Sequence, residues 1–262
     1  MLNQIANPLT AGKSSASPLR IGLARSQDDL RQAFSLTYQS YFRAGLTGNN
    51  PSGLRLTPYH LLNTSEVVVA KLRDTVVSTV SFFGDGNLGL PMQNMYPREI
   101  EMLRGRGLRL AEIGSLADRR TDPGRFISTF AQMGRLVAQI AIKRSVDTLV
   151  IVAHPKHARL YKRVLGFKQV GDHKDCPYAN GNPAEALYLR FDDLLGTRLH
   201  RQYFGEPYPA SSLERFEWGA ATRAYFGRIL DADGKIAVAV GMESYYDWGV
   251  CRNKTPVDLS VG

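Results

Sequence analysis

The stretch that decides the fold runs from residue 109 to residue 165. It reads RLAEIGSLA (109–117), DPGRFISTFAQMGRLVAQIAIKR (122–144), TLVIVA (148–153) and PKHARLYKRVL (155–165). The first and third segments have the apolar pattern of strands, with a possible bulge at Gly114-Ser115, and the second repeats apolar residues at helical spacing. Two strands joined through a helix lie parallel with a right-handed crossover. We therefore expect a ligand crevice at their carboxyl ends, near residues 115–125 and 153–160.

The flanking sequence adds antiparallel strands and further helices. The other predicted elements are a strand at 21–24, a helix from Ser26 to about Arg43, a hairpin of strands at 66–72 and 75–83, a helix at 95–103 and closing strands at 167–170 and 186–191. Because the hairpin is antiparallel and the 109–165 unit is parallel, the fold class is α/β, with a mixed central sheet flanked by helices.

The two ends of the chain differ from this central part. Residues 1–18 are rich in Ser, Ala, Pro and Asn and predict a flexible leader before a domain at 19–195. Residues 196–262 form a C-terminal extension that we expect to pack on or beside the domain. Within it, Ser211 and Glu214 fit a capping box that opens a helix through about Leu230, and 236–240 is a possible strand.

Composition excludes several classes of protein. The chain has 262 residues, of which 44% are hydrophobic and 22% charged, which is typical of a globular protein and not of a disordered or coiled-coil chain. Two cysteines cannot form a disulfide framework. The apolar runs are shorter than the roughly 20 residues that a spanning helix needs, and the N-terminus lacks a secretory signal pattern. We expect a soluble, cytoplasmic protein.

The net charge of +9 is concentrated in one segment. Residues 101–170 hold 14 basic and 5 acidic residues, while the rest of the chain holds 19 of each. This concentration favours an anionic partner or ligand, and a solvated basic surface is the alternative. Aromatic residues do not interleave with the basic excess, so nucleic acid is a disfavoured partner.

Glu112 is the most informative single residue. It stands inside the apolar strand sequence Leu110-Ala111-Glu112-Ile113, where a carboxylate is exposed at an edge, paired with an arginine, or placed at a functional site. His154 and His157 are too few for a metal centre without a third ligand, so no metal is expected. No Gly-x-Ser-x-Gly elbow is present, which leaves a serine hydrolase unsupported.

These motifs resemble the GNAT-type acyltransferases and, within them, the long-chain N-acyl amino acid synthases. The resemblance rests on the order of the 109–117, 149–155 and 157–167 sequences, with further likeness at 56–62, 88–92 and 96–97, and covers roughly residues 20–191. It implies a GNAT-like sheet and transfer of a fatty acyl group from acyl carrier protein to the α-amine of an amino acid. The related acyl-homoserine-lactone synthases carry an Arg three residues after the Glu; Ser115 stands there, which favours the amino acid group.

The resemblance also implies a donor. CoA-using relatives have an Arg/Gln-x-x-Gly-x-Gly/Ala loop that holds a pyrophosphate, whereas here Phe126 replaces the small residue and Asp122 adds negative charge. This departure favours the acyl-phosphopantetheine of acyl carrier protein, with acyl-CoA as the alternative and no permanently bound cofactor. A basic rim would speed docking of the acidic carrier. Its candidate residues are Arg119, Arg120, Arg125, Lys156, Arg159, Lys162 and Arg163.

The implied mechanism assigns a role to each candidate residue. Glu112 would take a proton from the amine, directly or through water, and the backbone N–H groups at Gly114-Ser115 would stabilise the oxyanion. Tyr161 is the candidate acid for the leaving thiolate, although it stands five residues before the Gly-Phe pair and relatives have Tyr four before it. The pantetheine would lie between Ile113–Leu116 and Val150–Ala153, with its phosphate near Arg119, Arg120 or Arg125 at the helix start. The candidate donor-binding residues are therefore Ile113, Gly114, Leu116, Arg119, Arg120, Gly124, Arg125 and Phe126.

Two other functions remain open. An acyl-CoA-dependent N-acyltransferase would use the same fold with another donor. A degenerate acyltransferase fold could instead bind an acyl carrier or nucleic acid without catalysis. Substitution of Glu112 by Gln discriminates between catalysis and binding.

Overall fold

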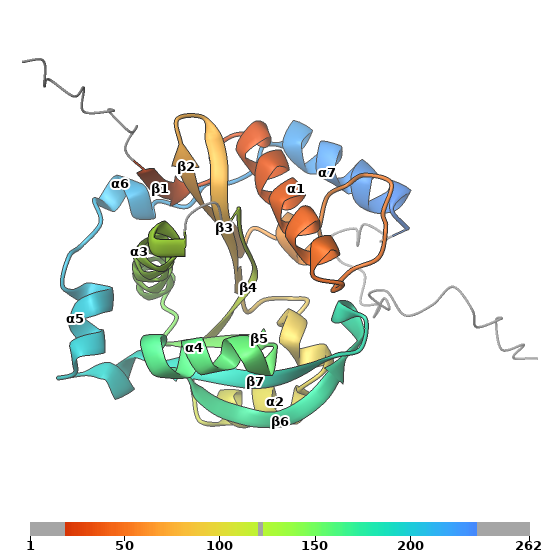
Figure 1. Ribbon diagram of the computed structural model, residues 1–262. Helices are drawn as coiled ribbons and strands as arrows, with labels where there is room; N and C mark the ends of the chain where they lie inside the picture. The colour runs from red at the N-terminus through yellow and green to blue at the C-terminus, as the bar shows by residue number, and fades with distance from the viewer. Residues whose placement is uncertain (1–18, 120–122, 235–262) are drawn as a thin grey trace, which may run out of the picture.

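The computed structural model describes residues 19–119 and 123–234, which form a seven-stranded sheet with helices on both faces (Figure 1). The strands lie in the order β1-β2-β3-β4-β5-β7-β6. Their bounds are β1 Leu19–Leu23, β2 Ser65–Leu72, β3 Thr75–Gly84, β4 Leu110–Asp118, β5 Thr148–Ala153, β6 Lys168–Cys176 and β7 Asn182–Arg190. Neighbouring strands are antiparallel except β4 and β5, which are parallel. The predicted mixed sheet is confirmed.

Two layers of helices cover this sheet. The helices are α1 Gln27–Arg43, α2 Pro97–Gly105, α3 Pro123–Lys143, α4 Pro155–Leu165, α5 Arg198–Phe204, α6 Ala210–Leu213 and α7 Ala220–Ala232. Short 3-10 turns lie at η1 Pro58–Leu61, η2 Pro91–Asn94, η3 Pro177–Ala179 and η4 Phe191–Leu194. One core packs α3, α4 and α5 against one face of the sheet. Two further cores pack α1 with α7, and α2 with η2, against the other face.

Local sequence signals account for several element ends. The Ser26 side chain caps α1 by accepting a hydrogen bond from the Asp29 N–H at 3.0 Å. The predicted hairpin is confirmed, and its turn is closed without glycine because Arg73 adopts a left-handed conformation with φ 54°. α4 ends at Gly166, whose φ of 78° also lies in the left-handed region that favours glycine.

Sequence reasoning misjudged two elements. β6 continues to Cys176, well past the predicted end at Val170, because it is an edge strand whose polar side chains face solvent and carry no apolar pattern. The helix expected from Ser211 to Leu230 is wrong. Arg25 donates to the carbonyls of Ser211 and Glu214 at 2.8 and 3.3 Å, α6 ends before Glu214, and α7 begins only after Gly219.

The described part of the C-terminal extension contributes to the cores. Tyr203 of α5 is buried against α3, and its hydroxyl donates to the Leu165 carbonyl at 3.0 Å. Phe226 of α7 meets Phe34 of α1 edge to face, with ring centroids 5.3 Å apart. The possible strand at 236–240 lies outside the described residues. Within the described ranges, none of the helices has the length and apolar character needed to cross a membrane.

Candidate active site

β4 and β5 separate from each other part-way along the sheet. Their parallel pairing joins three residue pairs and ends with Glu112 opposite Val150, although β4 runs on to Asp118 and β5 to Ala153. Beyond this point β4 remains bonded to β3, and β5 to β7. One backbone edge of each strand therefore lacks a partner strand, and we refer to this diverging stretch at the predicted carboxyl ends as the slot.

A bulge in β4 accompanies the separation. Ser81 of β3 lies opposite Gly114 and Thr79 opposite Ala117, so two residues of β4 oppose one residue of β3. Ser115 takes a left-handed φ of 52°, and the Thr37 hydroxyl donates to its carbonyl at 3.4 Å. A bulge of this kind bends its strand and increases the local twist, which turns β4 away from β5. A bulge was predicted at Gly114-Ser115; the structure places it one residue later, at Ser115-Leu116, because Gly114 remains paired with Ser81.

Glu112 lies where the two strands part. Its side chain belongs to an interior strand and the residue is only 6% exposed. Oε2 accepts a hydrogen bond from the Met92 N–H at 2.6 Å, and no described residue forms an ion pair with it. Burial raises the pKa of Glu112 to about 8, against a smaller lowering by the Met92 hydrogen bond. Two of the three explanations left by the sequence, an edge position and an arginine partner, are thereby excluded.

The contrast with the other buried glutamates is informative. Among the described residues, Glu66 is paired with Arg144 at 2.7 Å and Glu185 with Lys162 at 2.7 Å. Only Glu112 of these three lacks a cation. An unpaired buried carboxyl with a raised pKa is costly for stability and is typical of functional sites.

η2 supplies the hydrogen bond that holds this carboxyl group. Pro91 begins the turn, and Met92 follows it in the first turn, where backbone N–H groups have no acceptor within the helix. The Met92 N–H is therefore available to Glu112. Sequence reasoning noted residues 88–92 only as part of a resemblance and missed this contact, since nothing local connects η2 with β4.

Tyr161 of α4 packs against the core on the face of the sheet opposite to η2. Its ring packs edge to face against Phe130 of α3 and Phe167, at 5.7 Å in each case. Its hydroxyl makes no hydrogen bond to any described residue. Burial raises its pKa, with a smaller contribution from Tyr41 of α1, which belongs to the other face. The hydroxyl is therefore neutral at physiological pH and able to donate a hydrogen bond.

The candidate donor-binding residues lie along the slot and beyond it. Ile113 and Leu116 are partly buried against the α3 core. At the end of β4, Arg119 donates from Nε to the Val76 carbonyl at 3.0 Å. Phe126 stacks on Phe130 at 5.7 Å in the first turns of α3, which also include Gly124 and Arg125. Arg120 lies outside the described residues.

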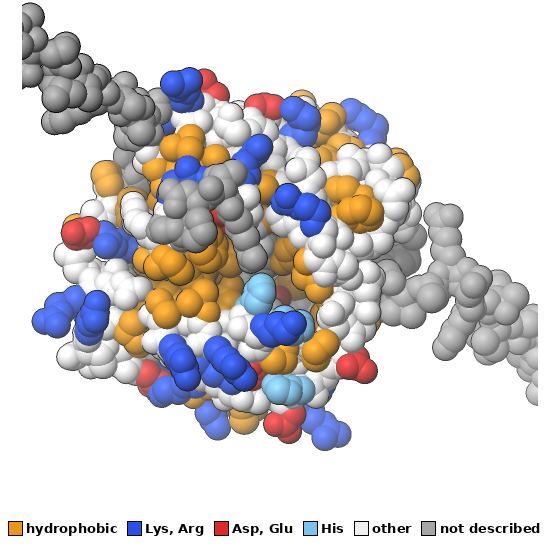
Figure 2. All heavy atoms as spheres, in the orientation of Figure 1, with side chains coloured by type: hydrophobic (Ala, Val, Ile, Leu, Met, Phe, Trp, Pro, Cys, Tyr) orange, Lys and Arg blue, Asp and Glu red, His pale blue; other side chains and the backbone are white. Residues whose placement is uncertain are grey.

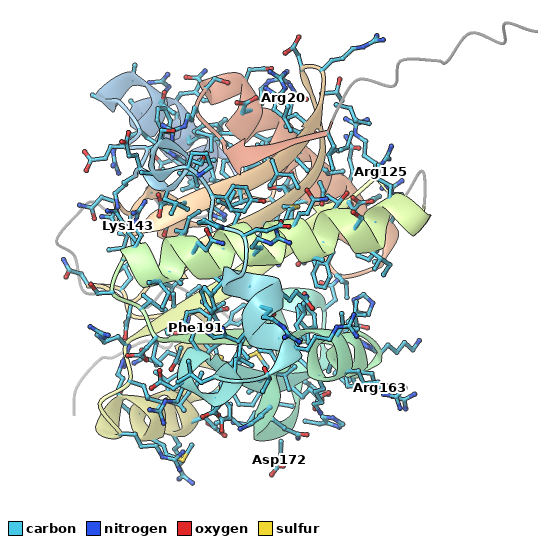
Figure 3. All side chains as sticks on the ribbon, turned by 90° about the vertical axis from the view of Figure 1, so that its left-hand side faces the viewer. Arg20, Arg125, Lys143, Arg163, Asp172 and Phe191 are labelled. Atoms are coloured by element: carbon cyan, nitrogen blue, oxygen red, sulfur yellow. The ribbon has the colours of Figure 1, made fainter. Side chains whose placement is uncertain are left out.

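Basic side chains stand on the same side of the molecule as the slot. Lys156, Arg159 and Arg163 of α4 are exposed. Lys162 differs from them, because its ammonium group is paired with the buried Glu185 carboxylate. Figure 2 shows apolar side chains gathered around a recess near the middle of this face, with lysines and arginines at its margin. Figure 3 shows Arg125 and Arg163 at one edge of the molecule and Lys143 at the other.

Comparison with known proteins assigns the chain to a family. A family model described as N-acyl amino acid synthase FeeM matches residues 32–190. The chain belongs to this family. The match begins within α1 and ends with β7, so it includes the slot and every candidate site residue, while α5–α7 lie beyond it. The resemblance drawn from the sequence motifs is confirmed, and this family member is an acyltransferase.

Solved structures show the same fold. The chain is similar to FeeM, an N-acyl amino acid synthase from uncultured soil microbes, with 23% identity, a TM-score of 0.60, and coverage of 71% of this chain and 98% of that chain. It is also similar to the AHL synthase LasI, with 17% identity, a TM-score of 0.54, and coverage of 73% of this chain and 96% of that chain. No curated protein matches the sequence.

Proposed function

We propose that this synthase transfers a long-chain fatty acyl group from acyl carrier protein to the α-amine of an amino acid, with Glu112 as the general base. The observation that carries the proposal is the buried, unpaired carboxyl group at the point where β4 and β5 separate. Family membership supports an N-acyl amino acid product. The donor, the chain length and the residue roles are part of the proposal.

The reaction joins the amine nitrogen to the thioester carbon and releases the thiol. A free α-amine has a pKa of roughly 8 or above, so much of it is protonated near neutral pH and must lose a proton before the nitrogen can attack; a base that takes this proton accelerates the reaction. Because the Glu112 pKa is about 8, the carboxyl group is well matched to accept this proton near neutral pH. The proton then lies on Glu112 and the negative charge on the thioester oxygen.

The slot suits the remaining steps. The released backbone edges of β4 and β5 can hydrogen-bond the amides of a pantetheine arm as an added strand would. Backbone N–H groups at Gly114-Ser115 would hold the oxyanion, and Ser115 has no paired residue in β3 because the bulge interrupts the ladder there. When the carbon–sulfur bond breaks, Tyr161 donates a proton to the thiolate and regains one from solvent, and Glu112 releases its proton to solvent, so no proton is gained or lost overall.

Two features support a carrier protein as donor. The stacked Phe126 ring occupies the first turns of α3, where CoA-using relatives have a small residue beside the pyrophosphate. The exposed cations of α4 form a surface of opposite charge to an acidic carrier. In this proposal, residues 19–195 form the catalytic domain and residues 196–262 form an extension of it.

Purified enzyme tests the function and the base together. Wild type is incubated with a panel of amino acids and a long-chain acyl group on acyl carrier protein, and N-acyl products are measured by mass spectrometry. kcat/KM should rise with pH toward about 8, where the Glu112 carboxyl ionises. Glu112→Gln should lower kcat by about 10²–10⁴-fold and leave only the part of the pH dependence that comes from ionisation of the amine itself. The exposed Glu101→Gln is the matched control and should behave as wild type.

Donor competition tests the partner. The same acyl chain is offered on acyl carrier protein and on CoA, each at several concentrations. A higher kcat/KM with the carrier protein supports the proposal, and an equal or higher value with acyl-CoA contradicts the donor assignment. Wild-type activity retained in Glu112→Gln contradicts the base, and no transfer from either donor contradicts the function as a whole.

A further inference from the structure

Arg55 is a partly buried cation that lacks an acidic partner. It lies between Leu54 and Leu56, which are buried beneath α1, and its own side chain turns toward η3. Nη2 donates to the Tyr178 carbonyl at 3.2 Å, and the guanidinium lies 4.5 Å from the centre of the Tyr41 ring. No described residue forms an ion pair with it. A guanidinium has several N–H donors, so most of them are unused here.

Arg223 is also partly buried without an acidic partner, but it donates to two backbone carbonyls, those of Trp218 and Leu61. Two other partly buried arginines have acidic partners. Arg104 is bonded to Asp85 by two hydrogen bonds of 2.8 Å each, and Arg144 is paired with Glu66. A desolvated guanidinium without a carboxylate is costly, and it is a ready bidentate site for one. The unsatisfied charge of Arg55 therefore points to an anionic ligand that is absent from the protein itself.

A continuous wall connects Arg55 with Glu112. Arg55 donates to the Tyr178 carbonyl of η3, and the Tyr178 phenol lies close enough to the Asn94 side chain of η2 for Asn94 to lower its pKa, against a larger rise from burial. The same short turn contains Met92, whose N–H holds the Glu112 carboxyl group. Figure 1 shows how this is possible, since the turn between β6 and β7 comes up beside the end of α1. The closeness is confirmed by a hydrogen bond from Asn180 to the Gly45 carbonyl at 3.0 Å.

The Cys176 thiol lies within the influence of both charges. Burial raises its pKa, and the backbone N–H groups of Tyr178 and Ala179 lower it. Arg55 adds a smaller lowering and Glu112 a smaller rise. Arg55, a cation without a carboxylate, and Glu112, a carboxyl group without a cation, therefore both lie near the Cys176 thiol.

We infer that Arg55 binds the α-carboxylate of the acceptor amino acid and thereby positions its α-amine at Glu112. An amino acid carries these two groups on one carbon atom, so a single acceptor satisfies both unpaired residues of the wall. Arg55 is then the residue that distinguishes an amino acid from a simple amine. The inference rests on the proposed function in that it takes an amino acid as the acceptor.

A purely structural role makes a different prediction. If Arg55 only braces η3 through the Tyr178 carbonyl, its replacement weakens every ligand of the site equally. If it binds the carboxylate, replacement weakens only ligands that carry one. The discriminating quantity is therefore the ratio of affinities for a carboxylate and for its neutral carboxamide.

Binding of reaction products measures this ratio without requiring turnover. N-dodecanoyl derivatives of a panel of amino acids, each paired with its carboxamide, are titrated at pH 7 by calorimetry into wild type, Arg55→Met, Arg55→Lys and the exposed Arg98→Met. Wild type and Arg98→Met should bind the best carboxylate at least about 30-fold more tightly than its carboxamide, equivalent to about 2 kcal/mol. Arg55→Met should reduce this preference to within about threefold while binding the carboxamide as wild type does. Arg55→Lys should fall between them, because lysine keeps the charge and loses the bidentate geometry.

Several results would overturn the inference. The first is equal binding of the carboxylate and the carboxamide by the wild-type protein, a result that overturns the inference before any variant is tested. Another is an Arg55→Met protein that keeps the full preference or loses both ligands to the same degree. If Arg55→Met does not fold, an unchanged preference in Arg55→Lys overturns it as well. An enzyme that acylates no amino acid, yet shows the Arg55-dependent preference, contradicts the proposed function and leaves the carboxylate site standing.

Discussion

Replacing Glu112 with Gln should make the protein more stable at neutral pH while it removes the proposed base. Burial raises the Glu112 pKa from its ordinary 4.5 to about 8, so the folded protein holds the proton more tightly than the unfolded chain does. The stability contributed by this group is therefore fully present below about pH 4.5 and is lost as the pH rises through 8. Gln has the same shape, can accept the Met92 hydrogen bond and cannot ionise.

The size of the effect follows from proton linkage. A pKa that moves from 4.5 to about 8 lowers the free energy of unfolding by at most about 3 kcal/mol at pH 7 and by about 5 kcal/mol at pH 9. Glu112→Gln should thus match wild type near pH 4.5 and exceed it by up to about 3 kcal/mol at pH 7. For a protein of this size, that gain corresponds to a rise in Tm of roughly 6–12 °C.

Urea unfolding followed by tryptophan fluorescence at pH 4.5, 7 and 9 measures the difference. Glu66→Gln is the matched comparison, because Glu66 is equally buried and is paired with Arg144. Its replacement leaves an unpaired cation and should destabilise the protein by about 3–5 kcal/mol. The reasoning is refuted if Glu112→Gln is also destabilising at pH 7, or if its stability relative to wild type does not change with pH.

Three further predictions concern the slot and its rim. Tyr161→Phe, which keeps the ring packing and removes the hydroxyl, should lower kcat by about 100-fold with little change in Tm; an unchanged kcat contradicts the acid role. Ser115→Gly should retain activity within about threefold, because only the backbone of the bulge is used. Ser115→Val should lose about 1–2 kcal/mol of stability, measured by urea unfolding, because a β-branched side chain is strained at the left-handed φ of 52°. Replacing Lys156 and Arg159 with Glu should raise KM for the acyl carrier protein by about tenfold and leave KM for acyl-CoA unchanged. A parallel rise in KM for both donors argues against a docking surface.

The central part of the fold could be predicted because its signals are local. The β4, α3, β5 and α4 segments have distinct apolar periods, and Pro155 and Gly166 mark the ends of α4. The length of β6 was underestimated, because an exposed edge strand does not need an apolar pattern. The helix expected from Ser211 failed for a tertiary reason, because Arg25, far away in the sequence, binds the carbonyls that the helix would have used.

The candidate site could be predicted only in part. Glu112 stood out because a carboxyl group in an apolar strand is an anomaly that the sequence itself displays. Arg55 gave no such signal, since an arginine in a connecting segment is usually solvated, and its lack of an acidic partner becomes visible only in the folded protein, where η3 packs beside it. Met92 was missed for a related reason, because the donor is a backbone N–H group and any residue type could supply it.

The three residue pairs between β4 and β5 have a mechanical consequence. They form the weakest seam in an otherwise continuous sheet, with β1–β4 on one side and β5–β7 on the other. Amide protons along this seam should exchange with solvent sooner than those of β2 or β7. A substrate arm that hydrogen-bonds to the edges of both β4 and β5 would connect the two halves of the sheet. Binding of the donor should therefore slow amide proton exchange throughout the sheet.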